Sequence, residues 1–71
     1  MNKIPDDKVS NFLRNCYREF EHDNKGQRLG QLMVNNFSRS YPGIQIPESV
    51  DCYYDNKKIA VFIQFITNVE V

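Results

Sequence analysis

The sequence predicts an all-α fold: a compact three-helix domain that spans residues 1–71. Two stretches repeat apolar residues at helical spacing, and a third apolar stretch lies near the C-terminus. Of the 71 residues, 41% are hydrophobic, which is enough for one core and too much for a disordered tail. We therefore expect a single small globular domain.

The first helix is predicted over residues 5–22. Pro5 suits the first helical position, where no N–H is needed, and two aspartates follow in the first turn, where they favour the helix dipole. Apolar residues then recur every three or four positions: Val9, Phe12, Leu13, Cys16, Tyr17 and Phe20. This stripe is typical of a helix that buries one face.

The second helix is predicted over residues 25–40. Asn24 and Gln27 fit a weak capping box before it, and the helix should end before Pro42. Its stripe is apolar except at Asn36. Gly30 lies inside the helix at a cost of up to ~1 kcal/mol relative to Ala, so we expect a neighbouring segment to pack closely there.

The last segment fits two structures. A helix over 56–67, capped by Asp55, would align its apolar residues at helical spacing: Ile59, Phe62, Ile63 and Ile66. The strict alternation of Ile59, Val61, Ile63 and Phe65 instead predicts an α+β fold with a C-terminal hairpin, 50–54/58–66. Periodicity alone does not decide between them.

Two short motifs resemble a group of short bacterial and phage proteins to which no activity is assigned. The motifs are Arg28-Leu29-Gly30-Gln31 and, about twenty residues later, Asp51-Cys52-Tyr53-Tyr54-Asp55, followed by Lys58-Ile59 and Phe62. In that group the second motif precedes a final short helix, so the resemblance favours the helix over 56–67. It implies no function.

The sequence shows no pattern that would support catalysis or metal binding. His22 is the only histidine, and it stands at the end of the first predicted helix without a nucleophile beside it. Cys16 and Cys52 are isolated, whereas metal sites use paired ligands such as CxxC. We therefore expect no catalytic residue, no metal and no cofactor, and we predict that the protein is not an enzyme.

The charge balance restricts the classes of partner. Nine basic residues offset nine acidic ones, which argues against nucleic acid, because affinity for phosphates comes largely from basic residues. No apolar run approaches the ~20 residues of a membrane-spanning helix. The sequence predicts a cytoplasmic protein with reduced thiols.

Two groups of residues are candidates for binding a protein partner. One is the polar side of the second helix, with Arg28, Gln31, Asn35 and Arg39. The other is Tyr53 with Tyr54, because tyrosine is enriched at interface hot spots. We also hypothesise that Arg28 or Gln31 ties the second helix to the 51–55 turn. Tyr53, Tyr54 and Phe65 have no certain place in the core, and we expect them to form one aromatic patch with Tyr41 near the 41–55 connector.

These observations predict a small non-enzymatic protein-interaction module, such as a phage or mobile-element accessory protein that binds and inhibits or otherwise modulates a host protein. A homodimer through the same surface is a further option. The alternative is a small winged-helix-like nucleic-acid-binding regulator, in which the hairpin would carry Lys57 and Lys58 at the wing tip.

Overall fold

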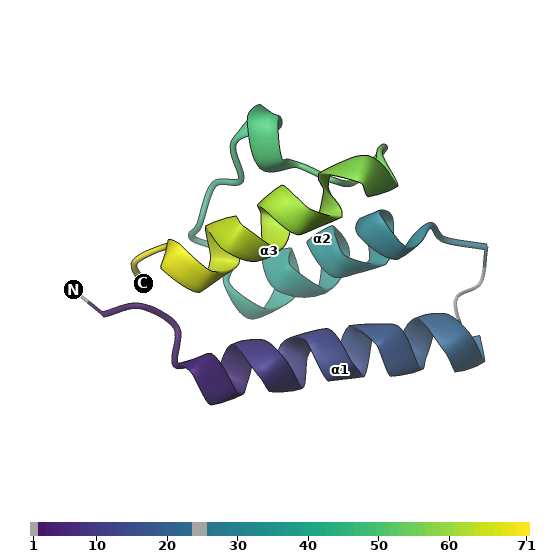
Figure 1. The fold of residues 1–71 in the computed structure, drawn as a ribbon, viewed down its shortest axis with the longest axis horizontal. Helices are drawn as coiled ribbons and strands as arrows, with labels where there is room; N and C mark the ends of the chain where they lie inside the picture. The colour runs from purple at the N-terminus through teal and green to yellow at the C-terminus, as the bar shows by residue number, and fades with distance from the viewer. Residues whose placement is uncertain (1, 24–25) are drawn as a thin grey trace.

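The structure is a computed structural model that describes residues 2–23 and 26–71. In this part of the chain, three α-helices form the fold (Figure 1): α1 (Asp6–Asp23), α2 (Leu29–Ser40) and α3 (Ile59–Asn68). Two short 3-10 helices, η1 (Glu48–Val50) and η2 (Asn56–Lys58), lie between α2 and α3. The predicted all-α three-helix fold is confirmed.

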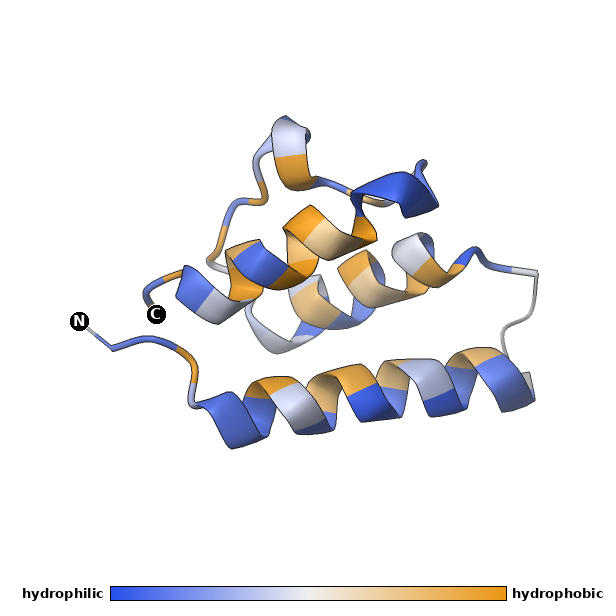
Figure 2. Cartoon of the chain, in the orientation of Figure 1, coloured by the Kyte–Doolittle hydropathy of each residue, from blue (hydrophilic) through white to orange (hydrophobic). Residues whose placement is uncertain are grey.

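α1 follows its predicted apolar stripe. The hydropathy colouring of Figure 2 shows the apolar side of α1 turned toward the other two helices and the polar side turned away. Val9 and Cys16 are buried, while Tyr17 lies at the edge of the stripe and is 42% exposed. The backbone carbonyl of Pro5 accepts hydrogen bonds from the N–H groups of Lys8 and Val9, so the helix begins directly after Pro5.

α2 begins at Leu29, four residues later than predicted. Asn24, the first residue of the predicted capping box, lies outside the described residues. Arg28 precedes the helix, and its side chain makes no capping hydrogen bond. The cap comes instead from a distant segment: Asn56 accepts a hydrogen bond from the Gly30 N–H at 3.0 Å through its Oδ1.

The segment after residue 55 is helical, and the alternative hairpin is wrong. Asp55 Oδ1 accepts a hydrogen bond from the Lys57 N–H at 2.9 Å and so caps η2, which leads directly into α3. Phe62 and Ile66, four residues apart, are buried, whereas Val61 is 39% exposed. Helical spacing thus buries the ring of Phe62. In a strand, Phe62 would lie on the face opposite to the one that carries Ile63.

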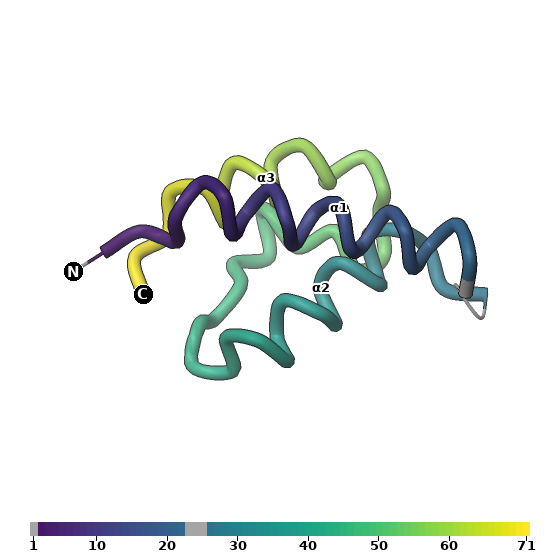
Figure 3. Tube along the Cα trace, turned by 90° about the horizontal axis from the view of Figure 1, so that it is seen from below, coloured from purple at the N-terminus to yellow at the C-terminus, as the bar shows by residue number. Residues whose placement is uncertain are grey.

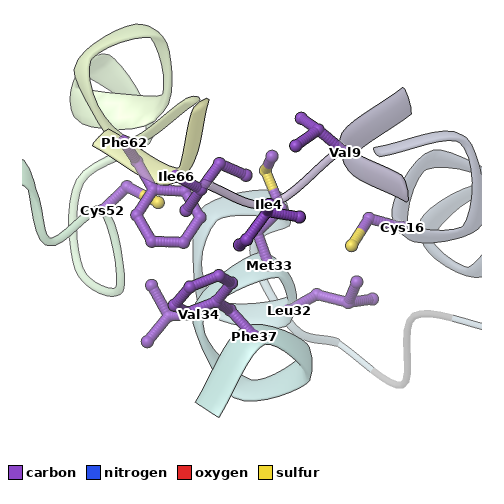
Figure 4. Close-up of a cluster of buried hydrophobic side chains, with 10 residues drawn as sticks. All are labelled: Ile4, Val9, Cys16, Leu32, Met33, Val34, Phe37, Cys52, Phe62 and Ile66. Atoms are coloured by element: carbon purple, nitrogen blue, oxygen red, sulfur yellow. The ribbon is translucent and has the colours of Figure 1, made fainter. Parts of the chain in front are cut away.

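The core joins all three helices (Figure 4). Phe37 of α2 lies between the other two helices, since its ring meets Phe12 of α1 at 6.0 Å and Phe62 of α3 at 5.8 Å, both edge to face. The buried apolar residues are Ile4, Val9, Cys16, Leu32, Met33, Val34, Phe37, Cys52, Phe62 and Ile66.

The two ends of the described chain lie side by side in both ribbon views (Figures 1 and 3). Lys3 and Glu70 form an antiparallel bridge, and the Val71 N–H donates to the Asn2 carbonyl at 2.8 Å. Within residues 2–23 and 26–71, no helix combines the length and the apolar character needed to cross a membrane.

Candidate functional site

The start of α2 packs directly against the backbone of Cys52. A Cβ at Gly30 would overlap the Cys52 carbonyl oxygen, so only glycine permits this approach. The Cys52 thiol in turn donates to the Gly30 carbonyl, with Sγ 3.5 Å from the oxygen. The close neighbour that the sequence predicts at Gly30 is therefore Cys52.

This contact positions the tyrosine turn, by which we mean residues 51–55. Gln31 Nε2 donates to the Tyr53 hydroxyl at 3.1 Å. The rings of Tyr53 and Tyr54 meet nearly edge to face, with centroids 4.6 Å apart. Tyr53 is half-buried, whereas Tyr54 is 79% exposed. The hypothesis that α2 is tied to this turn is confirmed for Gln31.

The two aspartates of the tyrosine turn bind backbone groups. Asp51 Oδ1 accepts from the Tyr53 N–H at 3.0 Å, and Asp55 Oδ1 accepts from the Lys57 N–H. Such local bonds are typical of turns and helix caps. Within the described part of the chain, no ion pair joins Arg28 to either aspartate, so the arginine version of the tie is not observed.

The six predicted partner-binding residues do not form one cluster. Arg28 and Gln31 lie at the start of α2, the end that carries Tyr53 and Tyr54. Arg39 lies near the other end of this 12-residue helix, about 18 Å long at 1.5 Å per residue. Its Nη2 donates to Asn36 Oδ1 at 3.0 Å. Asn35 is half-buried and lies between the two groups.

Tyr41 is not part of the tyrosine turn's surroundings. It follows the last residue of α2, and its half-buried ring packs on Phe37 with centroids 5.1 Å apart. The helix therefore separates Tyr41 from Tyr53 and Tyr54, which lie at its other end. Phe65 is half-buried and packs against the core. Of the four aromatics in the predicted patch, only Tyr53 and Tyr54 contact each other.

A hollow between α1 and α2 was missed by the sequence analysis. It has a volume of about 210 Å³. Asn36 Nδ2 on its wall donates to Glu19 Oε1 at 3.1 Å and lies 3.6 Å from Cys16 Sγ. The one signal for it was the polar Asn36 in an otherwise apolar stripe. Its lining residues are Phe12, Asn15, Cys16, Glu19, Asn36, Arg39 and Ser40.

Both cysteines are free, buried thiols. Burial raises the pKa of Cys52 to about 11, and burial likewise raises the pKa of Cys16, with a smaller opposing effect of its hydrogen bond to Asn36. A thiol with such a pKa is protonated at neutral pH and is a weak nucleophile. Residues 2–23 and 26–71 contain no group of three or more His, Cys, Asp or Glu side chains that could hold a metal ion.

No protein-family model matches the chain, and neither a curated protein nor a solved structure matches it.

Proposed function

We propose that this chain is a small non-enzymatic protein-interaction module that binds a partner protein through the tyrosine turn and the start of α2. Tyr54 carries the proposal. Its large ring is 79% exposed, although it is packed against Tyr53, and an ordered exposed tyrosine offers apolar area and a hydroxyl at a small entropic cost.

The other predicted partner-binding residues on α2 suggest the chemistry of the partner. The Tyr54 ring would fill an apolar pocket on the partner. The exposed Arg28 would pair with a carboxylate of the partner, for which its planar guanidinium is suited. Asn35, one turn of the helix beyond Gln31, would add a polar contact at the rim. Arg39 lies at the far end of α2 and would contact only a partner that covers the whole helix.

The biological setting is part of the proposal. The resemblance of the two motifs to short phage and bacterial proteins supports an accessory protein that binds and modulates a host protein. Buried free thiols are compatible with the reducing cytoplasm. The nucleic-acid alternative depended on a wing over 50–66, where the structure has η2 and α3 instead, and no observation favours it.

Site-specific photo-crosslinking tests this function. A benzophenone amino acid replaces Tyr54 in one protein and Tyr17, an exposed tyrosine on α1, in a matched control. Both are irradiated in lysate of a bacterial host, and the adducts are identified by mass spectrometry. We expect one stoichiometric adduct at position 54 and none at position 17.

The identified protein is then purified and its affinity measured. Tyr54→Ala should weaken binding at least about tenfold, as expected for a hot-spot aromatic, whereas Tyr17→Ala should not change it. An adduct with a second copy of the chain would identify a homodimer. Equal crosslinking at both positions, or none at position 54, would contradict the proposal.

A further inference from the structure

We propose that Gly30, Gln31 and Asn56 are positioning residues, which fix the tyrosine turn against the start of α2 before any partner arrives. This inference rests on the proposed function, because it assigns these residues a role in presenting Tyr54. It also changes the role of Gln31, which the sequence predicts as a residue that touches the partner.

Three contacts link the two segments across more than twenty positions of sequence. Gly30 gives its N–H to Asn56 Oδ1 at 3.0 Å, and its carbonyl accepts from the Cys52 thiol. Gln31 Nε2 binds the Tyr53 hydroxyl at 3.1 Å. The tyrosine turn is therefore held at Cys52 near its start, at Asn56 directly after its end, and at the tip of the Tyr53 side chain.

The Tyr53 contact transmits this order to Tyr54. The Tyr54 ring packs on the Tyr53 ring, which the hydrogen bond from Gln31 holds in place. The amide nitrogen of Gln31 already donates to the Tyr53 hydroxyl, so Gln31 affects partner binding through Tyr53 and not by direct contact. If the Tyr54 ring is already ordered in the free protein, binding costs less side-chain entropy than if the partner must first order the ring.

A pair of substitutions at position 31 tests the inference in the free protein. Gln31→Ala removes the bond to Tyr53, whereas Gln31→Glu keeps one, because its carboxylate accepts the hydrogen of the Tyr53 hydroxyl. Asn35→Ala, on the same helix, serves as the control. Ring and amide NMR signals of Tyr53 and Tyr54, with near-ultraviolet circular dichroism, report the order of the turn.

In Gln31→Ala we expect the NMR signals of Tyr53 and Tyr54 to move toward random-coil positions, while the signals of the α-helices keep their native positions. Gln31→Glu and Asn35→Ala should keep the native tyrosine signals. Native tyrosine signals in Gln31→Ala would overturn the inference. So would the same loss of order in Gln31→Glu and Gln31→Ala, because the hydrogen bond would then not be the cause.

Binding is measured with the protein that crosslinks at position 54. Gln31→Ala should weaken its affinity roughly 3- to 10-fold, the effect of leaving one or two side chains to be ordered on binding, and Gln31→Glu should restore it. An unchanged affinity with a disordered turn would overturn the inference. If nothing crosslinks at position 54, the proposed function fails, while the free-protein signals still decide whether these residues fix the turn.

Discussion

Gly30 and Gly43 differ in what a methyl group would meet. At Gly30 it would overlap the Cys52 carbonyl oxygen, whereas nothing lies within 4 Å at Gly43. Gly30→Ala should therefore lower the free energy of unfolding by about 1–3 kcal/mol, although alanine is the better helix former. Gly43→Ala should change it by no more than about 0.5 kcal/mol.

Urea unfolding of the two variants measures this difference. Because the overlap at Gly30 is with backbone, a side-chain rotation cannot relieve it. Equal midpoints for Gly30→Ala and the native chain would show that the Cys52 backbone does not pack there.

Cys52 gives the fold a dependence on alkaline pH. Burial raises its pKa from 9.0 to about 11. Between these values the folded chain holds more protons than the unfolded chain, so the free energy of unfolding falls as the pH rises. The contribution is fully present below pH 9 and is lost as the pH approaches 11.

The urea midpoint should therefore fall more steeply between about pH 9 and about pH 11 in the native chain than in Cys52→Ala. All other residues are the same in both proteins, so the difference between the two curves isolates Cys52. Parallel curves would contradict a raised pKa at Cys52.

At the scale of residues, local bonds were predictable and distant ones were not. Asp55 caps a group two positions away, and that cap could be predicted from its place before an apolar run. The cap on Gly30 comes from Asn56, 26 residues away, and no local pattern points to it. The sequence suggested that Gln31 reaches the 51–55 turn, but not which group it binds.

At the scale of elements, α3 offers the clearest test of the fold. Phe62 is fully buried, and its neighbour Val61 is 39% exposed. Phe62→Ala should cost about 3–5 kcal/mol, which is as much stability as a domain of this size usually has. We expect that variant to be largely unfolded by far-ultraviolet circular dichroism at room temperature, while Val61→Ala stays folded.

The hairpin pattern would give the opposite relation, because Val61 would then share a face with Ile63 and Phe65 and Phe62 would not. A greater loss of stability from Val61→Ala than from Phe62→Ala would thus contradict the helix. Apolar period alone left the two structures open, since the segment is rich in β-branched residues.

Helix bounds depended on the same distinction between local and distant signals. α1 was predicted within one residue at each end, because its stripe and its acidic first turn are contained in its own sequence. The start of α2 was predicted four residues early. The hollow between α1 and α2 was missed because it needs two helices in a known orientation.

At the scale of the whole molecule, the charge balance separates the two classes of partner. Nine basic and nine acidic residues give a net charge of zero, so phosphate neutralisation would supply little affinity. We expect no retarded band in a gel-shift assay with duplex DNA or single-stranded RNA at low salt and roughly micromolar protein. A salt-sensitive shift would revive the nucleic-acid alternative.

The antiparallel bridge between Lys3 and Glu70 has a consequence for engineering. It holds the two ends of the described chain about 5 Å apart, the spacing of paired strands. The domain can therefore replace the tip of a hairpin loop in an unrelated carrier protein without forcing the stems of that loop apart. In such a graft Tyr54 would be displayed on the carrier at a fixed orientation, where it could be used to probe for the partner protein.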